Sequence, residues 1–360
     1  MIDNIVTIDQ QALADNLAQV KSLAPHSKIL AMIKSDGYGH GAVAVASALK
    51  AADGFGVARL SEAIQLREAG IAKPILLMGG FFAIDELPEV VYYDLSIVLQ
   101  NHWQLNALIS TPLNKLISIW LKINTGMNRL GVSLQDVDIL MSALERCAWI
   151  KKPINLMTHL SDADDMMNHK SEEQIHLFLQ AVAKYPGEKS IANSATLLNF
   201  PLAHSDWVRP GIMLYGISPI KDKVGHDLGL KPAMTLSSRI IAIQNVRAGE
   251  AVGYASTWVA KRDSKIAVVA IGYGDGYPWS AKTGTPVLIK GKTYPLVGRV
   301  SMDMLSVDIT DSDDIQIGDA VILWGENLPI EIIAKFADTI PYELILKLTS
   351  RVKHVIQTTS

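Results

Sequence analysis

Cysteine, net charge and long apolar runs are all scarce in this chain of 360 residues. Cys147 is the only cysteine, which excludes an intrachain disulfide framework and a thiolate zinc site. The formal net charge is −3, without blocks of like charge, so neither a nucleic acid nor a membrane surface is an expected partner. No apolar stretch reaches the roughly 20 residues of a membrane helix, and the N-terminus lacks the features of a signal peptide. The sequence therefore predicts a soluble, cytoplasmic protein.

The pattern of apolar residues predicts an α/β fold in the first two-thirds of the chain. Hydrophobic residues make up 49%, enough for a sizeable core, and the length favours two domains. Eight short apolar runs alternate with stretches of helical spacing. The runs are residues 28–34, 54–59, 74–79, 95–99, 116–124, 154–160, 190–194 and 208–216. This alternation predicts a (β/α)8 barrel of the TIM type over residues 1–230, with an open doubly wound sheet as the competing fold.

The pattern of apolar and polar residues changes at about residue 231. Alternating or β-branched stretches follow one another at residues 234–246, 265–273, 285–300 and 304–309, separated by Gly-rich or charged turns. Only residues 331–340 have a helical pattern. Residues 231–360 are therefore predicted to form a mostly β C-terminal domain.

Polar residues stand where the predicted barrel strands end. In a barrel of this kind, functional residues gather at the C-terminal ends of the strands. These positions hold Lys34, Arg59, Lys122, Asn124, His159, Asn193, Ser194 and Arg209. Strands also end in polar residues simply because they reach the surface. A lysine, two arginines and a histidine converging on one rim nevertheless favour a functional site.

Two segments are suited to binding a phosphate. The segment "ANSATLL" places Asn193 and Ser194 at the expected start of a helix, where free backbone N–H groups and the helix dipole favour an anion. In "RPGIMLYG", Gly211 allows close approach of the backbone. The loops after the seventh and eighth strands commonly bind phosphate in this barrel. An ordinary helix cap and turn is the alternative interpretation.

Several familiar motifs are missing. The segment "DGYGHG" does not match the dinucleotide fingerprint, and "KS" precedes the glycines instead of following them as in a P-loop. No G-x-S-x-G or H-E-x-x-H occurs, and His159 beside nearby aspartates is a weak metal motif, so no metal is expected. A lysine on a phosphate-binding rim points instead to pyridoxal phosphate, which needs an amine, an anion site and a partner for its ring nitrogen. Arg209 as that partner would favour proton exchange at Cα.

At these positions the sequence resembles the alanine racemase family of fold-type III pyridoxal-phosphate enzymes. The resemblance covers essentially the whole chain. Its barrel motifs occur in order as "AMIKSDGYGHG", "LKINTGMNRLG", "MTHL", "NSA" and "RPGIMLYG", and those of the β domain as "VGYASTW", "GYGDGYP", "GRVSMD" and "PYE".

The resemblance implies an enzyme that interconverts L- and D-alanine with two bases. Lys34 would hold the cofactor and act on the D face. Tyr254 would act on the L face in the neighbouring subunit's site, which makes a homodimer obligatory. Met302 and Asp303 would also reach across to the substrate, with Met302 narrowing the pocket to a small side chain.

The remaining implied roles concern the cofactor. Phosphate contacts are expected from Tyr38, Asn193, Ser194, Gly211, Ile212 and Tyr342. Arg129 would bind the cofactor's phenolate oxygen and the substrate carboxylate, and Lys122 would be carbamylated to orient Arg129. His159 would hydrogen-bond both Arg209 and the partner's Tyr254.

Two departures from the family pattern and several alternatives accompany this assignment. Trp279 stands where an arginine of the access channel is common, and "RVKH" at residues 351–354 replaces R-V-P-R. A racemase of serine or of broader specificity and a non-catalytic pyridoxal-phosphate carrier are the alternatives. A related decarboxylase would need a cysteine in the β domain, whereas Cys147 falls in an expected barrel helix. The product could serve peptidoglycan synthesis or the enzyme could serve alanine breakdown.

Overall fold

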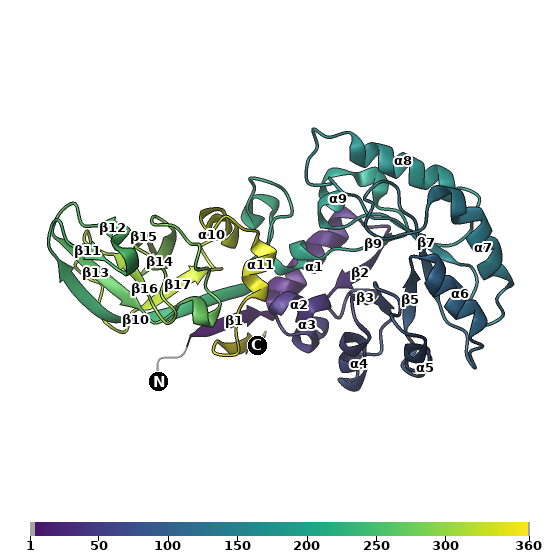
Figure 1. The fold of residues 1–360 in the computed structure, drawn as a ribbon, viewed down its shortest axis with the longest axis horizontal. Coiled ribbons are helices and arrows are strands. Elements are labelled where there is room, and N and C mark those ends of the chain that lie inside the picture. Colours follow the sequence, from purple (N-terminus) through teal and green to yellow (C-terminus); the bar gives the residue numbers. More distant parts are fainter. Residues whose placement is uncertain (1–3, 359–360) are drawn as a thin grey trace. The chain divides into compact units, whose positions relative to one another are not determined.

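The structure, a computed structural model, describes residues 4–358, and its contacts divide the chain into two compact units (Figure 1). The barrel unit comprises Ala14–Leu214 and Pro219–Asp222. The β unit comprises the residues up to Leu13, Tyr215–Ser218, and the chain from Lys223 onward. This division differs from the boundary at residue 230 that the sequence suggested, because the N-terminal strand and the segment around residue 216 pack within the β unit.

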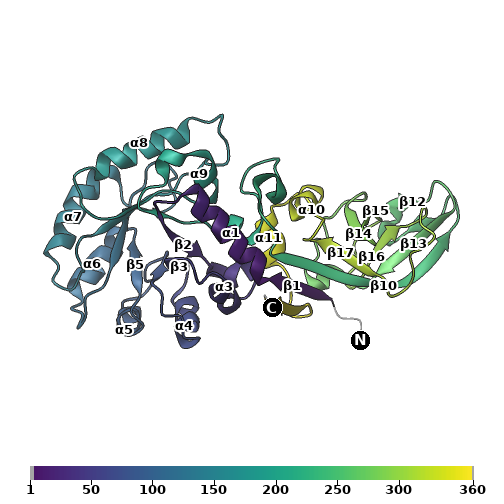
Figure 2. The ribbon, with the colours of Figure 1, turned by 180° about the vertical axis from the view of Figure 1, so that it is seen from behind.

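The barrel unit contains eight parallel strands that form a closed barrel (Figure 2). These are β2 (Lys28–Met32), β3 (Gly54–Val57), β4 (Ile75–Leu77), β5 (Ser96–Leu99), β6 (Ile119–Lys122), β7 (Asn155–Met157), β8 (Lys189–Ser190) and β9 (Trp207–Val208). The barrel closes where β2 pairs with β9, with Lys28 opposite Trp207 and Ile29 opposite Val208. The predicted (β/α)8 fold is confirmed, and the open sheet was the wrong alternative.

Helices cover the outside of these strands (Figure 1). They are α1 (Gln10–Leu23), α2 (Lys34–Gly39), α3 (Ala42–Ala48), α4 (Leu60–Glu68), α5 (Leu87–Tyr92), α6 (His102–Ser110), α7 (Val137–Arg146), α8 (Lys170–Val182) and α9 (Ser194–Asn199). Helix α7 shows why they pack: Val137, Leu140, Met141 and Leu144 recur at helical spacing and are all buried. Within residues 4–358, none of the helices combines the length and hydropathy needed to cross a bilayer.

One predicted strand differs from the structure. Residues 208–216 were expected to continue the eighth strand, but β9 ends at Val208 and Ile212–Tyr215 form a 3-10 helix. Pro210 lacks the N–H group that a central strand needs, so pairing stops there. The chain then turns at Gly211 across the rim of the barrel.

The β unit is built on an eight-stranded sheet in the order β13-β16-β15-β14-β17-β10-β1-β18. Because β13 also pairs with β10, the six strands β13, β16, β15, β14, β17 and β10 close on themselves and leave few exposed edges. Strands β11 and β12 form a separate two-stranded sheet. The strands are β1 (Ile5–Asp9), β10 (Met234–Val246), β11 (Ala251–Val252), β12 (Trp258–Val259), β13 (Ser264–Val269), β14 (Pro286–Ile289), β15 (Lys292–Val297), β16 (Leu305–Asp308), β17 (Ala320–Trp324) and β18 (Lys353–Gln357).

Two helices and several short turns complete the β unit. Helix α10 (Ile330–Phe336) begins one residue before the predicted helical segment 331–340 and otherwise overlaps it, whereas α11 (Pro341–Leu346) was not predicted. At six residues α11 is too short to show a helical period. The 3-10 turns η6 (Tyr254–Ser256) and η7 (Tyr273–Asp275) carry motifs of interest.

Alanine substitutions at two glycines of the β unit can test how tightly its backbone is packed. Gly216 and Gly249 both have positive φ, +80° and +90°. A Cβ on Gly216 would lie 1.8 Å from the carbonyl oxygen of Lys231, whereas a Cβ on Gly249 meets nothing within 4 Å. Both alanine variants should lose about 1–2 kcal/mol from the left-handed backbone, and Gly216→Ala should lose at least ~2 kcal/mol more from the clash. Urea unfolding followed by tryptophan fluorescence measures this difference; equal losses would contradict the packing described.

Candidate active site

The lysine singled out in the sequence begins a left-handed turn. Lys34 follows β2, and the next four residues, Ser35 to Tyr38, have φ between 52° and 60° and ψ between 41° and 54°. Backbone hydrogen bonds close the turn, from Gly37 N–H to Ile33 (2.9 Å) and from Gly41 N–H to Asp36 (2.9 Å). Such a conformation is costly for residues other than glycine, so the surrounding structure must hold it.

The Lys34 amine lies in an environment that disfavours its charge. Burial lowers its pKa, the Arg129 guanidinium lowers it further, and the Glu62 carboxylate opposes both effects. A larger fraction of the amine is therefore neutral near neutral pH than for a free lysine, and a neutral amine can act as nucleophile or base.

Four of the six residues predicted to hold a phosphate lie together at this turn: Tyr38, Asn193, Ser194 and Gly211. Ser194 Oγ accepts a hydrogen bond from Gly211 N–H at 2.8 Å. A Cβ placed on Gly211 would lie 2.6 Å from the Tyr38 hydroxyl, so only glycine fits beside that ring. Asn193 caps α9 by accepting from Thr196 N–H at 2.9 Å, as predicted. These side chains form one polar cradle, with Ile212 next in the chain.

Arg209 is buried and is held entirely by neutral acceptors. Its guanidinium donates to Ser190 Oγ at 2.5 Å and to the carbonyl oxygens of Thr158 and Ile191 at 2.7 and 3.1 Å. Burial lowers its pKa to about 10, which leaves it cationic at neutral pH. The barrel thus holds a fixed positive charge at this point of the rim.

His159 lies between Arg209 and Asn193. Arg209 Nη2 is 3.4 Å from His159 Nδ1, and Asn193 Nδ2 is 3.5 Å from Nε2. Burial, followed by the charges of Arg209, Lys122, Arg129 and Lys34, holds the pKa of His159 well below its usual range. The ring is therefore neutral at pH 7. Arg209 Nη2 and Asn193 Nδ2 can only donate, and a neutral imidazole has one acceptor nitrogen, so the ring accepts from one of these two neighbours at a time.

Lys122 ends β6 and is almost completely buried, with 7% of its surface exposed. Burial, and then the charges of Arg209, Arg129 and Lys34, lower its pKa to about 8. The cluster of Lys34, Lys122, Arg129 and Arg209 is thus rich in positive charge. In the part of the chain that the structure describes, Glu62 is the one carboxylate whose charge acts on Lys34. Such a site favours anionic ligands.

Two other residues of the predicted rim have local roles instead. Arg59 stacks on Phe82, with its guanidinium carbon 4.8 Å from the ring centre. Asn124 Oδ1 accepts from the N–H groups of Gly126 and Asn128 at 3.1 and 3.0 Å and shapes the loop that leads to Arg129.

Sequence reasoning missed two residues that support the cluster, Ser190 and Glu62. Ser190 lies at the end of β8, where a rim residue could have been expected. Glu62 lies near the start of α4, where a glutamate usually reads as part of a helix cap. No sequence signal therefore set it apart.

The remaining predicted residues belong to the β unit. Tyr254 lies in η6 and is 70% exposed, and Met302 is 53% exposed. Asp303 pairs with Arg351 at 2.8 Å, and Tyr342 lies in α11. Trp279 packs beside Arg299, whose guanidinium carbon is 5.8 Å from the ring centre. Among residues 4–358, no group of three or more His, Cys, Asp or Glu side chains is placed to hold a metal ion.

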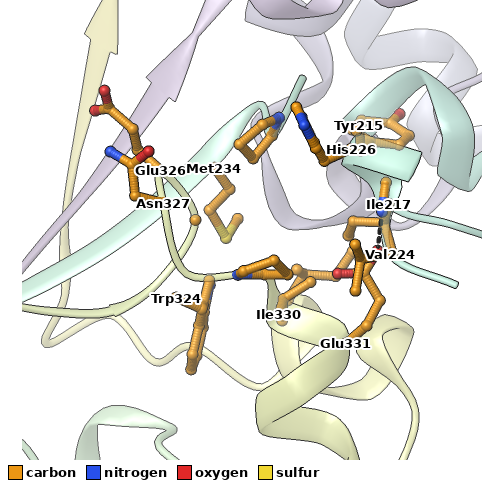
Figure 3. A pocket seen from close by; sticks show the side chains of 16 residues that line it. Tyr215, Ile217, Val224, His226, Met234, Trp324, Glu326, Asn327, Ile330 and Glu331 are labelled. Atoms are coloured by element: carbon orange, nitrogen blue, oxygen red, sulfur yellow. Dashed lines mark hydrogen bonds between the residues drawn. The ribbon is translucent and has the colours of Figure 1, made fainter. Parts of the chain in front are cut away.

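A cavity of about 390 Å³ lies elsewhere in the β unit (Figure 3). Its walls include the apolar side chains of Ile217, Met234 and Ile330 and the carboxylate of Glu331. Glu331 Oε1 accepts from the N–H groups of Ser218 and Gly225 at 2.8 and 2.9 Å. None of the predicted site residues lines this cavity, so it is separate from the cluster described above.

Comparison with known proteins gives matches over both units. Residues 8–219 match the family model of the alanine racemase N-terminal domain, and residues 233–356 match that of the alanine racemase C-terminal domain. An alanine racemase of Vibrio vulnificus is 48% identical over 346 residues, which are 96% of this chain and 97% of that protein. One from Coxiella burnetii is 50% identical over 356 residues, 97% of either chain.

Solved structures agree with these matches. The biosynthetic alanine racemase of Pseudomonas aeruginosa is 39% identical and has a TM-score of 0.96, covering 99% of this chain and 100% of that one. The alanine racemase of Acinetobacter baumannii is 40% identical with a TM-score of 0.94 and the same coverage.

Proposed function

The chain belongs to the alanine racemase family and interconverts the two enantiomers of alanine, and from this premise we propose which of its residues carry out the reaction. The observation that carries the proposal is the convergence of Lys34, the cradle of Tyr38, Ser194 and Gly211, and the fixed cation Arg209 on one rim of the barrel.

Pyridoxal phosphate is the cofactor we propose for this rim, and the residues present fit it. Lys34 offers an amine with a lowered pKa for the aldehyde. The Gly211 N–H donates to Ser194 Oγ at 2.8 Å, and the Ser194 hydroxyl would in turn donate its own proton to a phosphate. The missing side chain at Gly211 leaves room beside the Tyr38 hydroxyl. When bound, the cofactor would act as an electron sink that acidifies the Cα–H bond of the attached amino acid.

Each polar residue of the rim has a proposed part in holding the ligands. Tyr38, Asn193, Ser194, Gly211 and Ile212, with Tyr342 from the β unit, would hold the phosphate. Arg209 would face the ring nitrogen, because neutral acceptors hold its guanidinium in place and it keeps its charge. Arg129, in an exposed loop, would bind the cofactor's phenolate oxygen and the substrate carboxylate.

Inversion at Cα requires two bases on opposite faces. A proton must leave one face and another must return to the opposite face, so one group cannot do both without moving. We propose Lys34 for the D face, where its lowered pKa makes the neutral amine available. Tyr254 would serve the L face.

A partner subunit is the proposed source of the second base. Tyr254 is 70% exposed, and nearby loops also expose Tyr273, Trp279 and Met302. These loops adjoin: Tyr273 N–H bonds the Ser301 carbonyl at 3.0 Å and Gly274 N–H bonds the Met302 carbonyl at 2.8 Å. Exposed aromatic and apolar side chains gathered in this way are typical of a protein interface. We propose a homodimer in which Tyr254, Met302 and Asp303 of each β unit complete the other subunit's site.

His159 would then orient the tyrosine. If Nδ1 accepts from Arg209, Nε2 carries the proton and would donate it to the Tyr254 oxygen of the partner subunit, and the Asn193 amide, 3.5 Å from Nε2, would then not donate to this nitrogen. Since the ring is neutral, it does not compete for the proton that Tyr254 takes from the substrate.

The alternatives have less support. A non-catalytic carrier would not need the β unit, whereas residues 233–356 match the alanine racemase C-terminal domain. A serine racemase would share the machinery, and Met302 is the residue proposed to restrict the side chain. Peptidoglycan synthesis and alanine breakdown are both consistent with the activity, and the cytoplasmic location expected from the sequence stays a prediction.

Lys122 is the proposed site of a carbamate. The Lys122 ammonium would first lose a proton, which its lowered pKa of about 8 allows. The neutral amine would then attack carbon dioxide, forming an N–C bond as one C=O π bond opens, and would release a second proton, so that overall a cation becomes an anion. In the buried cluster this replaces repulsion from Arg129 and Arg209 by attraction. The carbamate would hold Arg129 in place for the substrate.

Replacing the cofactor lysine tests the central assignment. Purified protein supplied with pyridoxal phosphate should convert L-alanine to D-alanine and act far more weakly on L-serine. Lys34→Ala should lose the visible absorbance of lysine-bound cofactor and racemisation in both directions, because no other amine occupies this position. Absorbance and chiral chromatography provide the measurements. A variant that still bound the cofactor covalently would refute the assignment.

Replacing the tyrosine tests the two-base proposal. In Tyr254→Phe, solvent deuterium should enter Cα of D-alanine by way of Lys34 while exchange from L-alanine falls roughly 10²-fold or more. Proton NMR in deuterated water separates the two rates, and equal loss for both isomers would contradict one base on each face.

Mixing the two inactive variants provides the matching control for the dimer. A heterodimer of Lys34→Ala and Tyr254→Phe subunits contains one site with both wild-type bases. After random reassortment about a quarter of wild-type activity should return, since half of the dimers are mixed and each has one intact site. No recovery would argue against sites shared between subunits.

Carbon-13 bicarbonate tests Lys122. The wild type should show one carbamate signal by carbon-13 NMR and lose activity when carbon dioxide is excluded, with recovery on adding bicarbonate. Lys122→Gln should show no such signal. A wild-type protein without the signal, and with activity independent of bicarbonate, would exclude the modification.

A further inference from the structure

The left-handed turn after Lys34 needs a restraint, and Glu62 supplies it. Three residues other than glycine, Ser35, Asp36 and Tyr38, occupy the left-handed region in succession. Each is disfavoured by about 1–2 kcal/mol, so the turn would open without contacts that over-determine it. Glu62 Oε1 accepts a hydrogen bond from Ser35 N–H at 2.6 Å.

The other oxygen of the same carboxylate is anchored on a neighbouring element. Glu62 Oε2 accepts from the N–H groups of Ala58 and Arg59 at 2.7 and 3.0 Å. These residues follow β3, the strand that pairs with β2. One side chain thus ties the lysine turn to the loop beside it through three charge-assisted hydrogen bonds.

Glu62 also differs in sign from the other charges around the lysine. Lys34 interacts with Arg129 from the loop after β6, Lys122 at the end of β6, and His159 after β7. Burial and Arg129 lower the pKa of Lys34, and the Glu62 carboxylate raises it. Asp36, although close in sequence, is engaged as the cap of α3, where it accepts from Ala42 N–H at 2.7 Å.

We infer that Glu62 is a positioning residue for the reaction: its carboxylate holds the turn that presents Lys34 and places one negative charge beside the amine. The inference rests on the proposed role of Lys34 as cofactor lysine and D-face base. Glu62 would therefore have two roles. Holding the turn depends on the length of its side chain, and raising the pKa of Lys34 depends on its negative charge.

Two substitutions separate these roles. Glu62→Gln keeps the length but removes the charge, and its amide N–H group must face backbone donors. Glu62→Asp keeps the charge but shortens the reach to Ser35. Glu68→Gln, on the exposed end of the same helix α4, is the matched control that removes a carboxylate without touching the turn.

The first measurement is hydrogen–deuterium exchange of the holoenzyme. Glu62→Gln should accelerate exchange in the peptide covering residues 34–41 by at least roughly tenfold, the loss expected for a charge-assisted hydrogen bond. Glu68→Gln should leave that peptide unchanged. A uniform rise over the whole barrel would show a general loss of stability and would overturn the inference.

The second measurement is the pH dependence of Lys34 itself. Without the Glu62 charge the pKa of Lys34 should fall further, so the acid limb of kcat for D-alanine should move to lower pH. The pH dependence of pyridoxal-phosphate uptake by full-length protein stripped of cofactor should move in the same direction, because only the neutral amine attacks the aldehyde. Glu62→Asp should keep the wild-type pH dependence in both assays.

The outcomes distinguish this inference from the proposed function. Covalent cofactor in Lys34→Ala would refute the role of Lys34 itself. Loss of cofactor in Lys34→Ala, together with unchanged exchange and an unchanged acid limb in Glu62→Gln, would overturn only the role of Glu62. Equal shifts of the acid limb in Glu62→Gln and Glu62→Asp would overturn the electrostatic part.

Discussion

Unbalanced positive charge at one end of the barrel is the constraint on which the site depends. Lys122 and Arg209 are buried there, no carboxylate within residues 4–358 forms an ion pair with either of them, and Lys34 and Arg129 add to the same field. An uncompensated cation in a protein interior is unfavourable, so this arrangement is stable only if ligands or chemical changes supply negative charge. A phosphate, a substrate carboxylate and a lysine carbamate are the three anions that the proposed function brings. The ligand requirement is therefore a property of the folded chain alone.

The same field explains how groups of ordinary chemistry become useful near neutral pH. Burial, reinforced by the nearby cations, lowers the pKa of Lys34 and of His159 together, so the amine of Lys34 becomes more available and the His159 ring is neutral. Arg209 escapes this effect enough to stay charged, since its pKa is lowered only to about 10. One cluster thus separates a fixed cation, a base and a neutral hydrogen-bond donor by the different intrinsic pKa values of arginine, lysine and histidine.

The sequence could predict the barrel because buried parallel strands appear as apolar runs with polar residues after them. It located the rim well: Lys34, His159 and Arg209 each follow their strand within two residues, since β2 ends at Met32, β7 at Met157 and β9 at Val208. It could not predict pairings between distant segments. β1 lies parallel to β18, with Ile5 opposite Lys353. No local sequence pattern predicts a strand partner almost 350 residues away.

The role of Glu62 could not be predicted for a different reason: it depends on the backbone conformation of the turn after Lys34, which the sequence does not indicate. Glycines at 37, 39 and 41 are compatible with a tight turn, but three of the left-handed positions are Ser35, Asp36 and Tyr38, for which left-handed backbone is not the expected choice. From the sequence, Glu62 is interpreted as a helix cap. Its second role is recognisable only once the structure shows that the Ser35 N–H needs an acceptor. The strained segment beside Lys34 gains a restraint from Glu62 of the neighbouring helix α4, which accepts a hydrogen bond from Ser35 N–H. The glutamate that meets this need also adds the one negative charge that moderates the field, so the geometry of Lys34 and its protonation are coupled through a single side chain.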